Sequence, residues 1–223
     1  MFPVFASGFF VVPASTAKPN TSASASGTIG MSSPVALGLP YAYDADLNSY
    51  ALLSTIGSNY NNGTPPLPTE FWEANFTNSP NSGAIAGSMV TLQAIIKATF
   101  AVSSVNTGGG GLYPNIYLNL IANGTYSDAS AAPSNQGTLL LLNCNGAAAN
   151  AALAAGNTYQ GSFNGTATLT WGPFSGKTLD VNGITINVQW QYDSSPDDVS
   201  KSFNARINGS FSCGIYDLKY IYS

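Results

Sequence analysis

Two glutamates three residues apart, Glu70 and Glu73 in the stretch TEFWEANF, are the side chains best placed for chemistry in this sequence. Two carboxyl groups can hydrolyse a sugar or a peptide by general acid–base catalysis without any histidine. If residues 69–75 form a helical turn, both carboxyls face one cleft, and Gln93 or Gln189 would supply the oxyanion donor. The same stretch also fits a solvated turn with its aromatic residues packed inward, so hydrolysis is a secondary interpretation.

The sequence has few residues of the types that other catalytic mechanisms and metal sites require. The chain has no histidine and only two cysteines, which excludes Ser-His-Asp and Cys-His catalysis and argues against zinc, copper or haem sites. Asp193, Asp197 and Asp198 carry oxygen ligands that suit a hard cation, but they lack EF-hand spacing, and a solvated acidic loop explains them as well. We therefore expect a protein that is not an enzyme and that holds no metal or cofactor.

Cys144 and Cys213 are expected to form a disulfide, as in a secreted protein. Closing this long loop would stabilise the fold by roughly 4 kcal/mol in the chain-entropy model. The alternative is a pair of buried free thiols.

Charged residues are unusually scarce, at 7% of the 223 residues, with 6 Lys and Arg against 10 Asp and Glu. Six scattered cations cannot form the basic surface that nucleic acid requires, so no nucleic acid partner is expected. The hydrophobic share of 44% argues against disorder. A surface of hydroxyls and amides changes its charge little with pH, which suggests an extracellular and acidic medium; the alternative is simply a secreted all-β protein with a neutral surface.

Asn-X-Ser/Thr sequons recur along the chain and predict N-linked glycans. Most are Asn-Gly sequences, which turn chemistry also explains. The candidate sites are Asn20, Asn62, Asn75, Asn123, Asn164 and Asn208.

Alternation of apolar and polar residues dominates the chain beyond residue 33 and predicts long strands. Asn182-Gly183 between two alternating runs predicts a type I′ hairpin. Helix signals are limited to short segments at 47–53 (capped by Asp44 or Asp46), 69–75 and 147–155. The fold expected for residues 34–223 is an all-β, antiparallel immunoglobulin-like or pilin-like sandwich. The predicted strands cover residues 90–102, 115–121, 162–171, 178–181, 184–192 and 203–222.

The N-terminal segment is apolar at both even and odd positions, which indicates a strand buried on both faces. Residues 15–33 are small and polar and read as a linker, so residues 1–14 need not lie in their own domain. We expect residues 1–14 to complete the sheet of a neighbouring identical subunit as a donor strand. An ordinary first strand of the same sandwich, or a retained signal segment, is the alternative. The buried positions would be Phe2, Val4, Phe5, Ala6, Gly8, Phe9, Phe10, Val11 and Val12.

The apolar segment Met1–Pro13, the Ser/Ala linker and the sequon-rich, charge-poor β body together resemble the thread filament subunit of Sulfolobus-type archaea. This resemblance covers the whole chain but rests on pattern and composition. It implies a cell-surface filament of an acidophile: a glycosylated homopolymer joined by donor strands, with a role in adhesion. Archaeal type IV pilins match less well, because Pro3, Gly8 and Pro13 interrupt the long helix with which they begin.

The sequence thus predicts a secreted pilin without a membrane span, because no stretch reaches about 18 consecutive apolar residues. Two alternatives stay open. One is a secreted acid hydrolase, such as a glutamic or thermopsin-like peptidase, which would use Glu70 or Glu73. The other is a glycan-binding adhesin module with surface aromatic residues.

Overall fold

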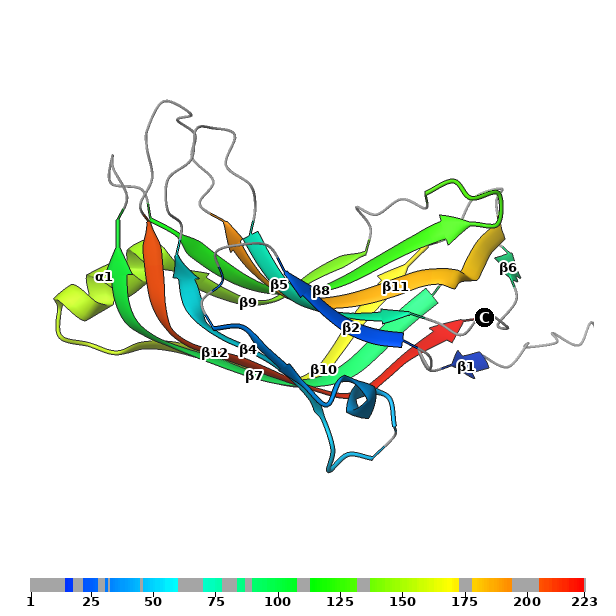
Figure 1. Cartoon of the computed structure of the whole chain (residues 1–223), viewed down its shortest axis with the longest axis horizontal. Helices are drawn as coiled ribbons and strands as arrows, with labels where there is room; N and C mark the ends of the chain where they lie inside the picture. The colour runs from blue at the N-terminus through cyan, green and yellow to red at the C-terminus, as the bar shows by residue number, and fades with distance from the viewer. Residues whose placement is uncertain are drawn as a thin grey trace, which may run out of the picture.

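The fold is an antiparallel β-sandwich of two sheets that lie face to face (Figure 1). A computed structural model describes residues 15–17, 22–27, 31, 33–44, 46–59, 70–77, 84–86, 90–107, 113–131, 137–172, 178–193 and 205–222. The predicted all-β sandwich is confirmed. The expected donor strand, residues 1–14, lies outside the described residues.

Sheet A has the strand order β10-β7-β12-β4-β3, with β1 paired to the C-terminal end of β12. All of its pairings are antiparallel. Its strands are β1 (Ser15–Ala17), β3 (Val35–Leu37), β4 (Ala51–Asn59), β7 (Val90–Asn106), β10 (Tyr159–Trp171) and β12 (Arg206–Tyr222).

Sheet B has the order β2-β5-β11-β8-β9, with β6 paired to β11. A short 3-10 helix, η1 (Leu39–Ala42), precedes β4, and α1 (Gly146–Ala154) connects β9 to β10. The strands of sheet B are β2 (Ser22–Gly27), β5 (Glu70–Thr77), β6 (Ala84–Ala86), β8 (Asn115–Tyr126), β9 (Thr138–Asn145) and β11 (Thr178–Asp193).

The core forms because alternate residues of each long strand point between the sheets. In β7 every even position from Val90 to Val102 is buried, as the alternation predicts. Trp190 of sheet B packs edge-on against Phe211 of sheet A, with ring centroids 5.5 Å apart, and its indole N–H donates to the Leu53 carbonyl at 3.3 Å. Each large apolar side chain buried in this way contributes about 1.5–3 kcal/mol to folding.

Two of the three predicted helical segments are wrong. Residues 47–53 and 69–75 instead contribute to turns and to strands β4 and β5. The aspartates that were expected to cap a helix form short turns, in which Asp44 and Asp46 each accept a hydrogen bond from the backbone N–H two residues later. The helix at 147–155 is confirmed as α1, which begins after Asn145, whose side chain accepts a bond from the Ala148 N–H at 2.9 Å.

The predicted hairpin at Asn182-Gly183 is also wrong, because β11 runs through these residues without reversing. The register against β8 jumps between Asp180 and Thr185, so Asn-Gly lies in a bulge rather than in a turn. The same point marks the change of partner on the other side of β11, from β6 to β5.

The segment expected as a linker, residues 15–33, contributes β1 to sheet A and β2 to sheet B. Alternating small residues allow this pairing because Ala23 and Ala25 of β2 turn inward, while Ser24 stays exposed.

The expected disulfide is absent, since Cys144 and Cys213 are both free and buried. Cys144 lies on β9, which packs against β10 across the sandwich, whereas Cys213 lies on β12, two strands further along sheet A. That offset is about 10 Å in addition to the spacing between sheets, too far for an S–S bond.

Candidate functional site

Glu73 and Gln189, the possible acid and oxyanion donor, lie opposite each other on β5 and β11. The Gln189 side-chain amide donates to Glu73 Oε2 at 3.1 Å, and the Ser26 hydroxyl donates to Glu73 Oε1 at 3.0 Å. Gln93 belongs to β7 of the other sheet and is not part of this group. Glu70 begins β5, so the helical turn that was expected to pair the two glutamates does not exist, and the side chain of Glu70 lies outside the described part.

The Glu73–Gln189 pair belongs to a row of hydrogen-bonded polar side chains across the outer face of sheet B. Asn187 donates to Asn75, which itself donates to Ser26 at 3.0 Å, and Asn123 donates to Asn187 at 3.2 Å. Asn187 is only 6% exposed and Gln189 only 9%, because neighbouring strands hold their side chains in contact. This row of side chains links β2, β5, β11 and β8. Glu73 supplies the carboxylate in it.

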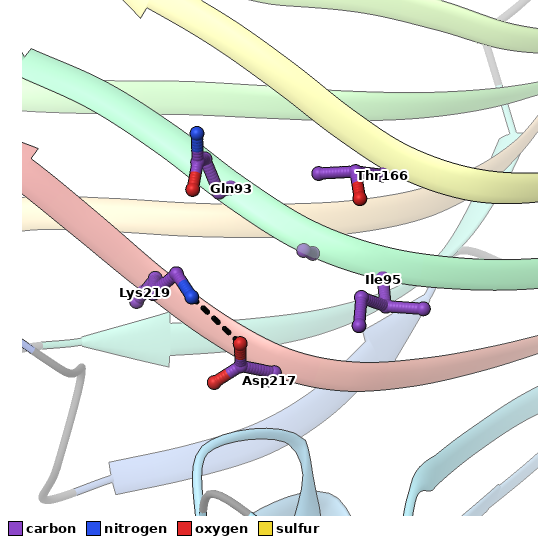
Figure 2. Close-up of a pocket in the computed structure, with 6 residues that line it drawn as sticks. Gln93, Ile95, Thr166, Asp217 and Lys219 are labelled. Carbon is purple, nitrogen blue, oxygen red and sulfur yellow. Dashed lines mark hydrogen bonds and ion pairs between the residues drawn. The ribbon is translucent and has the colours of Figure 1, made fainter. Parts of the chain in front are cut away.

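A second polar group lies on the outer face of sheet A (Figure 2). Asp217 has a left-handed backbone (φ 43°) where the register of β12 shifts against β7, so it and Lys219 both avoid the core while Leu218 is buried. The Lys219 ammonium lies 2.7 Å from the Asp217 carboxylate, beside a hollow of about 120 Å³ that Gln93 and Thr166 also line. The hollow is small, and the ion pair satisfies both charges.

Tyr50 and Tyr216 pack against each other on the same face, with ring centroids 5.0 Å apart and the ring planes tilted by 33°. The Lys97 ammonium lies 4.7 Å from the centre of the Tyr216 ring. Desolvation, followed by Tyr50 and Cys213, raises the pKa of Tyr216 above its usual value, so this phenol stays neutral. Sequence reasoning missed both groups on this face, because neither residue spacing nor composition reveals which strands become neighbours.

Strand β10 forms one edge of sheet A and has a hydrogen-bonded partner, β7, on one side only within the described part of the chain. Its 13 residues, YQGSFNGTATLTW, include no charge and no proline, and its register with β7 is unbroken. The inward-facing residues divide the strand into two halves. Ala167, Leu169 and Trp171 are buried, whereas Tyr159 and Phe163 are only half-buried.

The half-buried residues of β10 belong to an apolar strip that we call the β9–β10 seam. It runs along the side of the sandwich where β9 of sheet B and β10 of sheet A lie next to each other, joined by α1. Hollows of about 390 and 280 Å³ lie over the neighbouring β7–β10 pairing, beside Gly161 and Phe163 respectively. The seam consists of the half-buried apolar residues Leu139, Leu141, Leu142, Leu153, Tyr159 and Phe163.

The glycosylation candidates differ in accessibility. Asn164 is exposed on β10, whereas Asn75, Asn123 and Asn208 are half-buried, and each donates from its side-chain nitrogen to Ser26, Asn187 or Ser104. Asn20 and Asn62 lie outside the described residues.

The acidic loop expected as a possible cation site is described only at its start, because β11 ends at Asp193, and Asp197 and Asp198 lie outside the described residues. In the described ranges, no three Asp, Glu or Cys residues gather as a metal site, and no helix is long and apolar enough to cross a membrane.

Over the described residues, the fold is an all-β, two-sheet sandwich in which β10 forms a long edge with a partner strand on one side only. No protein-family model matches the chain, and no curated protein matches its sequence.

Proposed function

We propose that the chain is the structural subunit of an extracellular, pilus-like filament that polymerises head to tail by donating residues 1–14 to the next subunit. The main support is the place where those residues join the fold. Ser15 pairs with Tyr222, the last residue of β12, so residues 1–14 join the sandwich at one end of sheet A. Figure 1 shows β1 beside the C-terminus at this end and α1 at the opposite end.

The composition of the segment supports donation. Residues 1–14 carry no charge, and their aromatic and branched side chains need an apolar site. Burying several of them in a neighbour would contribute on the order of 10 kcal/mol, before the costs of association.

A contact between two different surfaces of the same protein repeats without closing, and therefore gives fibres. The resemblance to thread filament subunits supports the same function, with adhesion as its role. N-linked glycans would cover the filament, and the exposed Asn164 is the described sequon best placed to carry one.

The experiment replaces Phe5 and Phe9 by lysine in the full chain and examines the product by negative-stain microscopy. We expect the wild type to form fibres and the double variant to remain unpolymerised, because two charges cannot be buried without partners. Ser127→Lys, in an exposed turn, is the control and should polymerise normally. Fibres from the double variant, or none from the wild type, would refute the proposal.

A second candidate function is acid hydrolysis, favoured by the 3.1 Å contact between Gln189 and Glu73. As water adds to the substrate carbonyl, Glu73 would act as the acid and donate a proton to the leaving group, while the Gln189 amide would stabilise the oxyanion. If this is correct, the wild type cleaves a denatured protein at pH 3, Glu73→Gln loses about 100-fold or more of the rate, and Glu70→Gln retains it. An inactive wild type, or full activity in Glu73→Gln, would leave the pair as part of the polar row only.

A further inference from the structure

The outer edge of β10 lacks the features that normally protect an edge strand. Unpaired N–H and C=O groups attract other strands, and proteins block them with charges, proline, bulges or short strands. β10 has 13 residues, no charge, no proline and an unbroken register. Such an edge, exposed in water, would promote aggregation unless another strand paired with it.

The other edges of the sandwich are protected better. β3 has 3 residues and β2 has 6, against 13 in β10, so both offer a much shorter edge. β9 has 8 residues, and its pairing with β8 shifts register at Asn119. Among the strands of the described chain, β10 therefore offers the longest uninterrupted edge.

The side chains beside this edge point to an apolar occupant. Phe163 and Tyr159 face inward but stay half-buried, although they pack beside the apolar core. A strand added to β10 would cover this strip with its inward side chains, while its backbone satisfied the edge. The edge itself carries no charge that would select a charged partner.

We infer that the β9–β10 seam is the strand-accepting site of the subunit and that residues 1–14 of a second copy occupy it, paired with the outer edge of β10. This inference rests on the proposed filament function. The length of the segment matches: 14 extended residues span about 46 Å, and β10 spans about 43 Å. Both are free of charge.

The geometry also decides between the chain's own segment and that of a neighbour. Ser15, Tyr222, Val90 and Trp171 form one row across sheet A, so residue 15 lies about 19 Å from the outer side of β10. The open half of the seam begins at Phe163, about 26 Å further along β10. A straight path from residue 15 to that half is about 32 Å and would use about ten of the 14 residues, so the chain's own segment could not pair along the whole of β10, whereas the segment of a second copy can.

Engineered disulfides in the full chain test this inference. Ser162 on β10 and Ser24 on β2 are a matched pair, since both are exposed serines on edge strands. Each is changed to cysteine and combined with a cysteine scan of residues 4–10, followed by mild oxidation near neutral pH. Cys144 and Cys213 are buried, and burial raises the pKa of both thiols, to about 12 for Cys144, so they contribute little background.

We expect at least one Ser162→Cys combination to give a ladder of covalent oligomers on a non-reducing gel, with the Ser24→Cys set unlinked. A ladder from Ser24→Cys alone, or a cross-link within single chains, would overturn the inference. Fibres visible by microscopy without any ladder would overturn the acceptor assignment but leave the filament proposal standing. Absence of fibres from the wild type would overturn both.

Discussion

At the scale of single residues, the two thiols show how burial controls chemistry. Cys144 and Cys213 both lie in the core, where the neutral thiol is favoured over the thiolate. Burial raises the pKa of Cys144 from 9.0 to about 12, and it also raises the pKa of Cys213. Neither thiol is available for redox chemistry near neutral pH.

These raised pKa values predict a loss of stability in alkali. Above pH 9 the unfolded chain releases thiol protons that the folded chain still holds, so the folded state binds more protons and its free energy of unfolding falls as pH rises. For Cys144 the fall continues to about pH 12. Urea unfolding from pH 8 to 11.5 should show this slope, and Cys144→Ala should have a shallower one. Equal slopes in both proteins would contradict the prediction.

Two members of the polar row, Glu73 and Gln189, could be singled out from their residue types alone. Glu73 and Gln189 were predicted as possible partners because a carboxylate and an amide suit acid–base chemistry, and the structure places them 3.1 Å apart. The pairing of Glu70 with Glu73 failed because it assumed a helical period, whereas residues three apart on a strand lie on opposite faces. The partners Ser26 and Asn187 could not be predicted, since they depend on which strands become neighbours.

At the scale of elements, periodicity located most strands but not their ends or their edges. The alternation from Val90 to Val102 predicted the larger part of β7, because a strand with one face in the core must alternate. The hairpin predicted at Asn182-Gly183 was wrong because residues that favour positive φ occur in bulges as well as in turns. The exposed edge of β10 was not predictable, since its alternation resembles that of β7, which lies between two strands.

The β9–β10 seam is less well covered along one half of β10 than along the other. Near Trp171 the core side chains of β10 are large and fully covered, whereas toward Tyr159 glycines alternate with Tyr159 and Phe163. Gly161 has no room for a side chain, because a Cβ there would lie 2.4 Å from the Phe100 ring. The Phe100 ring thus fills the space at Gly161, whereas a Cβ at Gly165 would meet nothing within 4 Å, so this half of β10 is covered less evenly than the half near Trp171.

At the scale of the whole molecule, the scarcity of charge predicts stability in acid. Protonating all 10 carboxylates leaves 6 cationic side chains on 223 residues, so little repulsion develops between them. The ion pair of the described residues, Asp217 with Lys219, is half-buried at the surface, and the core is held by apolar contacts and backbone hydrogen bonds that do not titrate in this range.

Thermal unfolding followed by circular dichroism should therefore change little between pH 7 and pH 2, by less than about 8 °C, which is the shift expected for roughly 2–4 kcal/mol in a domain of this size. Asp217→Asn is the control, because it removes the described ion pair and should show a still smaller dependence on pH. A midpoint that fell by tens of degrees, or a state at pH 2 that kept its strands but lost its aromatic signal, would contradict the prediction. The same insensitivity would extend to the proposed subunit contact, since residues 1–14 and β10 hold no group that acid could protonate.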